Sequence, residues 1–441
     1  MRWILPPSGF FIEANVPKLQ FIPILIEEDG SYPIEANRYL VERSCGEWAP
    51  AMESGKQPHV LTLRSRKNSA QRMVAFLRWC RNCNLDWRDL DYIDHIRGGY
   101  QLDLLKGTKS AATRALKRGT VNQYVDEACG FLTWAHERGY RVPVRIPVRG
   151  QAVLSSNGTH SRGHLPKEVK VRADKLSLPE VSLDYLPSAE SVYKWLASVA
   201  DRHPVKALVF ELIITTGCRI DEAHQLRVTC FPRKSEWAES VYLEGRLPLQ
   251  LQYGVKGPKV LPQEKLSVRT RTVFVPIDLA ERIERYMMFT RPNLLARFRR
   301  TSGYPAETDR LWLGEKKSLP VSYQMLWKTW TTSSMCPPGW HPHAGRHYFA
   351  VEEIVRATVD LMSLHGLRDP AEAPIGWLQG LMQNQVRLIL SPLLGHTSEA
   401  TTMRYLRAAH RRLATVTGHP SLAWNSKIDR KTNKNAPAET N

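Results

Sequence analysis

The residues able to do chemistry stand in four short segments of the second half of the chain. Residues 216–222 read TGCRIDE, residues 255–259 read VKGPK, and residues 341–347 read HPHAGRH. Residues 394–396 read LGH, and Tyr405 follows nine residues after His396. Two arginines, several histidines and a tyrosine with cationic neighbours suit the attack of a tyrosine on a phosphodiester. The rest of the chain is then expected to bring DNA to that tyrosine.

Each role follows from the residue type. A phosphodiester transition state carries extra negative charge, and Arg219 and Arg346 offer permanently charged forks that match phosphate geometry. Electrostatic stabilisers of this kind are each worth roughly 10²–10³ in rate. Tyr405 has a reference pKa near 10, so only about 0.1% of it is phenolate at neutral pH. It therefore needs a base or a strong positive field, and His343 can accept the proton.

Taken singly, these residues have plainer interpretations. Arg219 could form a helix-end ion pair with Glu222, and Tyr405 could be a core residue of an amphipathic helix. A third alternative is a metal site, whose ligands would be His341, His343, His347 and Glu352. Against a metal, Pro342 is expected to break the helix that an i, i+4 histidine pair needs, and no second cluster of fixed spacing is present. We expect neither a metal nor another cofactor.

Composition favours a nucleic-acid partner for a chain of 441 residues. Lys and Arg number 62 against 43 Asp and Glu, which gives a net charge of +19. Such an excess suggests a polyanion, because neutralising phosphates releases counterions, although ribosomal, secreted and membrane-surface proteins are also basic. The seven scattered cysteines fit a reducing cytoplasm. We expect neither a signal peptide nor a membrane span, and the lone Cys80–Cys83 pair is more simply two helix thiols than a zinc site.

Pattern along the chain predicts a mainly α protein with a small antiparallel β-sheet. We predict an unassigned N-terminal extension (1–59), a helical DNA-binding domain (60–140), a basic linker (141–186), a catalytic domain (187–425) and a disordered tail (426–441). In the helical domain, a helix over 62–83 precedes one that begins with a capping box, Thr120 and Gln123, and stops at Gly139. In the catalytic domain, Ser188 is expected to cap the first helix.

Strands are predicted at Ser240–Leu243, Leu249–Val255 and Thr270–Pro276, the last from its alternating pattern. Helices are predicted on both sides of these strands, and those that follow them are Leu279–Thr290, Tyr323–Thr331, His343–Val355, Trp377–Leu390 and Ala400–Val416. The catalytic segments thus fall at helix ends, on a hairpin turn and on the final helix.

With its four segments in this order, the chain resembles the tyrosine recombinases, the class of phage integrases and Xer-type resolvases. That family carries a Thr-Gly-x-Arg-x-x-Glu box, a hairpin lysine, a His-x-x-Arg-His box, and a Leu-Gly-His box with a tyrosine nine residues on. The resemblance covers residues 187–425 and, with lower specificity, residues 60–140. Any one box is weak, whereas four in order are specific.

The resemblance implies a set of roles. Tyr405 is the nucleophile, Arg219 and Arg346 clamp the phosphate, and His396 donates a hydrogen bond to it. Lys256 protonates the leaving 5′-oxygen, with Lys259 as the rival. Glu222 orients a catalytic cation, and His347 supports a neighbour.

The resemblance also implies a fold and partners. A helical core-binding domain and a tyrosine-recombinase catalytic domain would wrap double-stranded DNA. A homotetramer would act on paired sites, with accessory proteins possible. The enzyme would be cytoplasmic and nucleoid-associated, of prokaryotic, phage or mobile-element origin. It would recombine DNA, by integration, excision or transposition, through a 3′-phosphotyrosyl link without metal or ATP.

Three departures from the family pattern stand out. Gly345 replaces the usual leucine, and we expect Tyr348 or Phe349 to offset the lost apolar side chain. The interval between Arg346 and His396 is long, which implies an insertion around 358–375. The hairpin is long as well. Two other functions therefore stay open: a type IB topoisomerase-like enzyme that relaxes supercoils, and a non-catalytic DNA-binding protein with a degenerate site.

Overall fold

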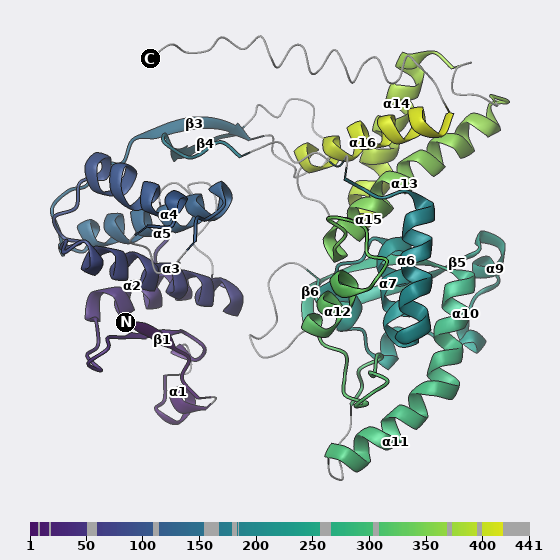
Figure 1. Ribbon diagram of the computed structural model, residues 1–441, viewed down its shortest axis with the longest axis horizontal. Helices are drawn as coiled ribbons and strands as arrows, with labels where there is room; N and C mark the ends of the chain where they lie inside the picture. The colour runs from purple at the N-terminus through teal and green to yellow at the C-terminus, as the bar shows by residue number, and fades with distance from the viewer. Residues whose placement is uncertain are drawn as a thin grey trace. The chain divides into compact units, whose positions relative to one another are not determined.

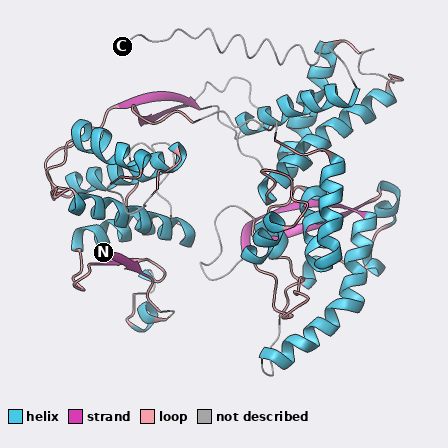
Figure 2. Cartoon of the chain, in the orientation of Figure 1, coloured by secondary structure: helices cyan, strands magenta, loops and turns pink. Residues whose placement is uncertain are grey.

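The computed structural model divides into two compact units, unit 1 (Met1–Glu180) and unit 2 (Val181–Asn441). Helices dominate both units, and the strands form small two-stranded antiparallel pairs (Figure 2). The predicted mainly α fold class is therefore confirmed. The residues that the structure describes are 1–7, 9–16, 19–50, 60–108, 114–153, 167–178, 183, 185–255, 266–302, 308–367, 373–394 and 399–417.

Unit 1 is built on long helices that share an aromatic core. Its helices are α1 (Phe10–Glu13), α2 (Ile34–Cys45), α3 (Leu63–Asn82), the π-helical η3 (Tyr92–Gln101), α4 (Leu102–Lys106) and α5 (Arg118–Glu137). Its strand pairs are β1 (Arg2–Ile4) with β2 (Ile24–Ile26) and β3 (Val148–Val153) with β4 (Lys167–Arg172). Phe76, Trp79 and Phe131 are fully or almost fully buried where α3 packs against α5. The Thr62 side chain caps α3 by accepting from the Ser65 N–H, so the helix predicted over 62–83 begins as expected.

Two segments left outside the predicted helical domain contribute to this unit. Leu25 of β2 and Tyr39 of α2 lie in the same buried cluster as the long helices, although the sequence assigned residues 1–59 to no domain. The segment 141–186, predicted as a linker, contains the hairpin β3–β4. The Arg172 side chain at the end of β4 is 1% exposed and bonds to α5 and η3. This arginine fastens the hairpin to the helices.

Unit 2 surrounds the buried helix α7 (Pro204–Thr216), which packs against its neighbours on several sides (Figure 1). The other elements before the hairpin turn are α6 (Ala189–Arg202), α8 (Ile220–His224), η4 (Val228–Cys230), η5 (Lys234–Glu236), α9 (Glu239–Glu244) and β5 (Arg246–Tyr253). Those after it are β6 (Leu266–Pro276), α10 (Ile277–Arg285), η6 (Tyr286–Thr290), α11 (Arg291–Ser302), α12 (Tyr323–Thr332), α13 (Pro342–Leu364), α14 (Ile375–Gln385), η8 (Val386–Leu390), α15 (Ser391–Leu394) and α16 (Glu399–Thr417). Ser188 caps α6 as predicted, by accepting from the Ser191 N–H.

The β5–β6 pair presents one apolar face to the core. Leu249 pairs with Val273, and both side chains are fully buried, whereas the alternate positions Gln250 and Thr272 are exposed. This is the alternation that predicted the second strand. A register shift after Leu251 bends the hairpin on the approach to residues 256–265, which lie outside the described part of the chain.

Two local predictions were wrong. Ser240–Leu243 belongs to helix α9 and not to a strand, because Val241 alone of its turn is buried and Gly245 ends the helix in the left-handed conformation. Helix α5 begins at Arg118 after Lys117, so Thr120 and Gln123 lie inside its first turns and form no capping box. The residues that suggested a strand at 240–243 and a capping box at Thr120 are compatible with a helix. Packing against the rest of the unit decides where each helix lies.

The segment around 358–375, where the sequence analysis expects an insertion, contains the end of helix α13 and the start of helix α14. Helix α13 continues to Leu364, and α14 packs back against it. Met362, Ala373 and Leu378 form a small buried cluster of their own there, with Trp377 against it. The described residues of this segment therefore add helix to the C-terminal end of α13, away from the first turns that carry the histidines.

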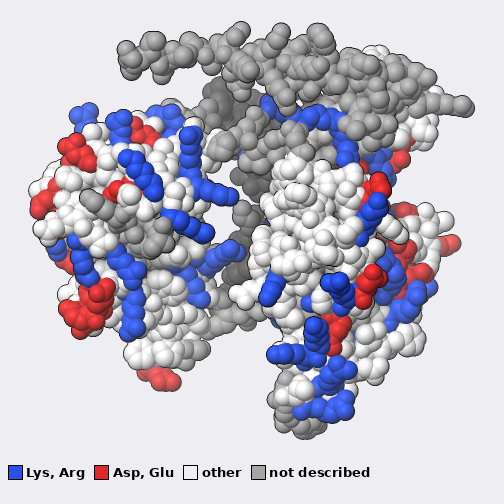
Figure 3. All heavy atoms as spheres, in the orientation of Figure 1, with Lys and Arg blue, Asp and Glu red and all other residues white. Residues whose placement is uncertain are grey.

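Basic side chains are spread over the surface. Figure 3 shows Lys and Arg over both units on the face in view, gathered over α11, which carries Arg297, Arg299 and Arg300. Among the described residues, no helix is long and apolar enough to cross a membrane.

Candidate active site

The first site segment is a sharp turn between α7 and α8. Gly217 ends α7 with φ +63°, and a Cβ there would overlap the Phe349 ring and approach Leu394, so only glycine fits. Arg219 then opens α8 with an extended backbone. Its N–H donates to Glu222 Oε2 at 2.6 Å, and its Nη1 donates to Glu222 Oε1 at 2.9 Å. The turn thus fixes the direction of the Arg219 side chain, because Glu222 binds both its backbone N–H and its guanidinium.

Glu222 is fully buried and serves a second arginine. Arg271 of β6 donates from Nε to Oε1 at 3.1 Å and from Nη2 to Oε2 at 2.5 Å. Burial acts to raise the pKa of Glu222, but the hydrogen bonds and charges of Arg271 and Arg219 outweigh it and hold that pKa below its ordinary value. Glu222 is therefore a carboxylate that orients two guanidinium groups.

Arg271 is a site residue that the sequence analysis missed. A signal was present, since the alternation that buries Val273 and Val275 also puts Arg271 on the inner face, opposite the buried Leu251. An arginine in an apolar register needs a buried carboxylate partner. Glu222 is such a carboxylate, but it lies 49 positions from Arg271, so no local spacing in the sequence indicates that the two residues pair.

Arg346 lies at the centre of the site, in the first turns of α13. It is 1% exposed and donates to the backbone oxygens of Gly217 and Leu394, while Arg271 donates to that of Leu393. Burial lowers the pKa of Arg346 to about 9, and the positive charges of Arg219 and Arg271 act in the same direction. The two buried arginines thereby tie the end of α15, where the fourth segment begins, to the turn of the first segment.

The nucleophile predicted from the sequence faces this cluster from α16. Tyr405 is 1% exposed, and its hydroxyl lies 2.8 Å from Nδ1 of His347. Burial raises the pKa of Tyr405 to about 12, while the charges of Arg346 and Arg219 act to lower it. Tyr405 is thus a neutral phenol held beside two cations.

Three histidines continue from Tyr405 along the start of α13. The His347 and His343 rings meet edge to face with centroids 4.3 Å apart, and His341 stacks beyond His343 at 6.5 Å. Part of the His343 ring is exposed to solvent. Burial of the rest of the ring lowers its pKa to about 4, and the positive charges of Arg346 and His341 act in the same direction. His341 caps the helix, since its Nδ1 accepts from the Ala344 N–H at 3.1 Å.

Pro342 starts α13 instead of breaking it, so the reason given against an i, i+4 histidine pair was wrong: His343 and His347 form one. Even so, no group of three or more His, Cys, Asp or Glu side chains in the described part of the chain is arranged to hold a metal ion.

Gly345 is accounted for by a different neighbour from those expected. A Cβ at Gly345 would lie within 3 Å of the Trp330 ring and 3.2 Å from Ile214. Trp330, which is fully buried, occupies the space of the missing side chain, whereas Phe349 fills the space beside Gly217. The expectation that Tyr348 or Phe349 compensates for the missing leucine side chain is therefore wrong. Trp330 fills the space beside Gly345 instead.

Three predicted residues, Lys256, Lys259 and His396, lie outside the described part of the chain. Their neighbours in sequence are placed. Gly254, with φ +73°, packs so closely on the Asp221 carbonyl that a Cβ would overlap it, and Val255 is buried. Leu394 is fully buried beneath Gly217. The described neighbours Gly254, Val255 and Leu394 therefore lie beside the turn that carries Arg219.

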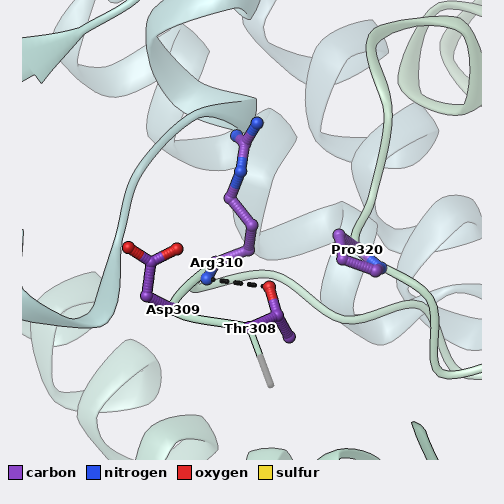
Figure 4. Close-up of a pocket in the computed structure, with 4 residues that line it drawn as sticks. All are labelled: Thr308, Asp309, Arg310 and Pro320. Atoms are coloured by element: carbon purple, nitrogen blue, oxygen red, sulfur yellow. Dashed lines mark hydrogen bonds between the residues drawn. The ribbon is translucent and has the colours of Figure 1, made fainter. Parts of the chain in front are cut away.

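A separate hollow of about 550 Å³ lies elsewhere on unit 2, lined by Thr308, Asp309, Arg310 and Pro320 (Figure 4). The Arg310 N–H donates to the Thr308 hydroxyl at 3.2 Å, and the Arg310 guanidinium donates to the His224 carbonyl. Asp309 pairs with Arg227. These polar groups are engaged with one another, and we assign the hollow no chemistry.

No protein-family model matches the sequence, and no curated protein matches it. Solved structures do align with it. XerH site-specific recombinase bound to a palindromic difH substrate is 14% identical over 89% of this chain and 90% of its own, with a TM-score of 0.45. The Tn1549 transposon integrase with transposon right-end DNA is 12% identical over 87% and 99%, with a TM-score of 0.43.

A lambda integrase dimer bound to a COC′ core site is 12% identical over 81% and 90%, with a TM-score of 0.39. These proteins are recombinases or integrases, the class that the four sequence boxes resemble. The similarity is one of backbone structure, at 12–14% sequence identity, and the chemistry depends on the residues of the site.

Proposed function

We propose that the chain is a site-specific DNA recombinase that cuts and rejoins strands through a covalent link to Tyr405. The observation that carries the proposal is the meeting of Tyr405 with Arg219, Arg346 and the histidines of α13 around one turn of backbone. These residues come from three separate places in the sequence. A neutral tyrosine beside under-neutralised arginines suits attack on an anionic phosphodiester.

In the proposed reaction, Arg219 and Arg346 hold the scissile phosphate and stabilise the charge of its transition state. Tyr405 attacks, a 3′-phosphotyrosyl link forms, and the 5′-oxygen leaves with a proton from Lys256 or Lys259. His396 hydrogen-bonds the phosphate. A 5′-hydroxyl of a partner duplex then attacks the link and releases Tyr405. The energy of the phosphodiester is conserved in the link, so the reaction uses neither ATP nor a metal.

The partners belong to the same proposal. The net charge of +19 suits double-stranded DNA, and exchange between two duplexes needs several active sites, for which a tetramer on paired sites is the simplest assembly. Integration, excision and transposition of a mobile element are all outcomes of this one reaction.

The test is a covalent trap. The protein is incubated with nicked duplexes that carry the border sequences of its own genetic element, in the presence of a chelator. We expect an adduct whose attached peptide contains Tyr405, and Tyr405→Phe should abolish it while DNA affinity stays nearly unchanged. An adduct on arbitrary DNA would favour relaxation of supercoils instead, and tight binding with no adduct would indicate a DNA-binding protein without catalysis.

A further inference from the structure

The Tyr405 hydroxyl has a specific partner in His347. The two atoms lie 2.8 Å apart, and the rings are tilted by 49° with centroids 5.5 Å apart. When His347 carries its proton on Nε2, Nδ1 has a free lone pair and accepts the hydrogen bond that the hydroxyl donates. A base within hydrogen-bond reach of the nucleophile's proton is the first geometric requirement for general-base catalysis. His347 meets that requirement.

The contact is fixed by the packing of two helices. Helices α13 and α16 lie against each other, and Phe349, Ile354, Leu406 and Leu413 belong to one buried cluster between them. Farther along, Arg412 of α16 pairs with Glu352 of α13 at 2.9 Å. These contacts, which follow His347 along α13 and Tyr405 along α16, hold the two residues in register.

His343, the base first expected, fits a different task. It lies one helical turn before His347, with the ring centroids 4.3 Å apart, and it is partly open to solvent. The same arginines that would bind phosphate disfavour a charge on its ring. His343 is better suited to contact the phosphate or to pass a proton outward than to keep one.

Since Tyr405 is the nucleophile in the proposed function, we propose that His347 removes its proton during cleavage and returns it during rejoining. As Oη of Tyr405 bonds to phosphorus, its proton moves to Nδ1 of His347, and the O–H electron pair stays on the oxygen. The bond from phosphorus to the 5′-oxygen breaks, and that oxygen takes a different proton from the lysine. Rejoining runs the same transfers in reverse, so no co-reactant is needed.

Several charged groups set the pH at which this transfer works. Arg346 and Arg219 face Tyr405 from α13 and the start of α8, Arg404 adds a positive charge from α16, and Tyr185 precedes α6. The cations favour the phenolate. His343 faces His347 from the preceding turn. The positive field therefore stabilises the phenolate but disfavours a lasting charge on His347, so His347 has to hold the proton only while the phosphate is being attacked.

The discriminating variant is His347→Asn. The asparagine Oδ1 takes approximately the place of Nδ1 and accepts a hydrogen bond, but it cannot take a proton. With the nicked border duplexes, we expect adduct formation to slow by roughly 10²–10⁴-fold. DNA affinity and thermal stability should be unchanged, and the remaining rate should rise with hydroxide concentration. Glu352→Gln, which removes an ion pair with Arg412 between the same two helices, is the matched control and should keep the wild-type rate and its dependence on pH.

A second change makes the test independent of folding losses. Replacing Tyr405 by a fluorinated tyrosine of lower pKa supplies phenolate without a base. We expect this replacement to restore most of the rate lost in His347→Asn and to change the wild-type background little.

The outcomes separate cleanly. A His347→Asn protein that cleaves at the wild-type rate overturns the proposal. So does a slow variant that the fluorinated tyrosine does not rescue, because His347 would then only position Tyr405. If the unaltered protein forms no adduct on any border duplex, the proposed function itself fails, and the role of His347 fails with it.

Discussion

Two buried arginines, one in each unit, stand in opposite electrostatic surroundings. Arg172 and Arg346 are both 1% exposed. Arg172 bonds to Asp126 at 3.2 Å and to Gln101 at 2.7 Å. Although burial acts to lower the pKa of Arg172, the hydrogen bond that Arg172 donates to the Tyr92 hydroxyl and nearby negative charge raise it above the ordinary value. The pKa of Arg346 falls instead to about 9.

The difference lies in the neighbours. Asp126 and neutral oxygen acceptors surround Arg172, whereas Arg346 donates to backbone oxygens, and the nearby carboxylate of Glu222 is bound by Arg219 and Arg271. An arginine with a structural role, such as Arg172, has a carboxylate beside it that neutralises its charge. One that is kept short of counter-charge favours an incoming anion, so the imbalance in unit 2 is the physical mark of a binding site.

Removing Glu222 should have the largest effect. In Glu222→Gln, Arg219 and Arg271 lose the carboxylate that both of them bind, and Arg346 loses a nearby negative charge. Leaving buried charge uncompensated typically costs about 3–5 kcal/mol. We expect the free energy of unfolding, measured by urea titration with tryptophan fluorescence, to fall by about that amount. The matched change Glu352→Gln removes a partly exposed ion pair with Arg412 and should cost no more than about 1 kcal/mol. Equal losses in the two variants would show that the cluster carries no excess charge.

The two arginines should then separate stability from activity. Arg172→Met leaves buried Tyr92 and Gln101 without the guanidinium that bonds to them, and should lower the free energy of unfolding by about 3 kcal/mol. Arg346→Met removes a repelled cation, so we expect a smaller loss of stability and a fall of roughly 10²–10³-fold in adduct formation. A full cleavage rate in Arg346→Met would contradict its role as a phosphate clamp.

Acid should weaken unit 2 through His343. Its pKa is about 4 in the folded chain, below the ordinary 6.5, so the unfolded chain binds more protons between these values. Stability contributed by neutral His343 is therefore present above pH 6.5 and is lost as the pH falls towards 4. We expect His343→Gln to lose less stability than the unaltered protein between neutral and acidic pH, as measured by urea unfolding. The opposite sign would place His343 beside an anion.

Simple anions should give the smallest effect. Pyrophosphate bound to the partly exposed Arg219 would stabilise the folded chain by about 1.4 kcal/mol at ten times its dissociation constant. The melting temperature, followed by calorimetry, should rise with pyrophosphate in the unaltered protein and rise less in Arg219→Gln. A shift that survives in Arg219→Gln would locate the anion elsewhere, for example on α11.

The sequence predicted what depends on neighbours along the chain. The turn at Gly217, the cap at Ser188 and the strand from Val273 to Val275 follow from local conformational preferences, and the structure has all three. The Gly217 turn also presents Arg219 and Glu222 together, as their spacing indicated.

Contacts between distant segments could not be predicted in this way. Arg271 meets Glu222, and Trp330 fills the space beside Gly345, only because unit 2 packs β6 and α12 against the helices that carry the motifs. The hydrogen bond from Tyr405 to His347 likewise joins helices 58 positions apart in sequence. The types of these residues were visible beforehand, but their partners depend on tertiary packing.

The covered position of Tyr405 bears on which molecules the protein can react with at all. At 1% exposure, the hydroxyl is out of reach of a freely diffusing small phosphodiester. A ligand large enough to displace the surroundings of the hydroxyl through many contacts has to supply the free energy that uncovers it. Small chromogenic esters should therefore fail as substrates even with every reacting group intact, and the unbound protein should be inert towards electrophiles that modify exposed tyrosines.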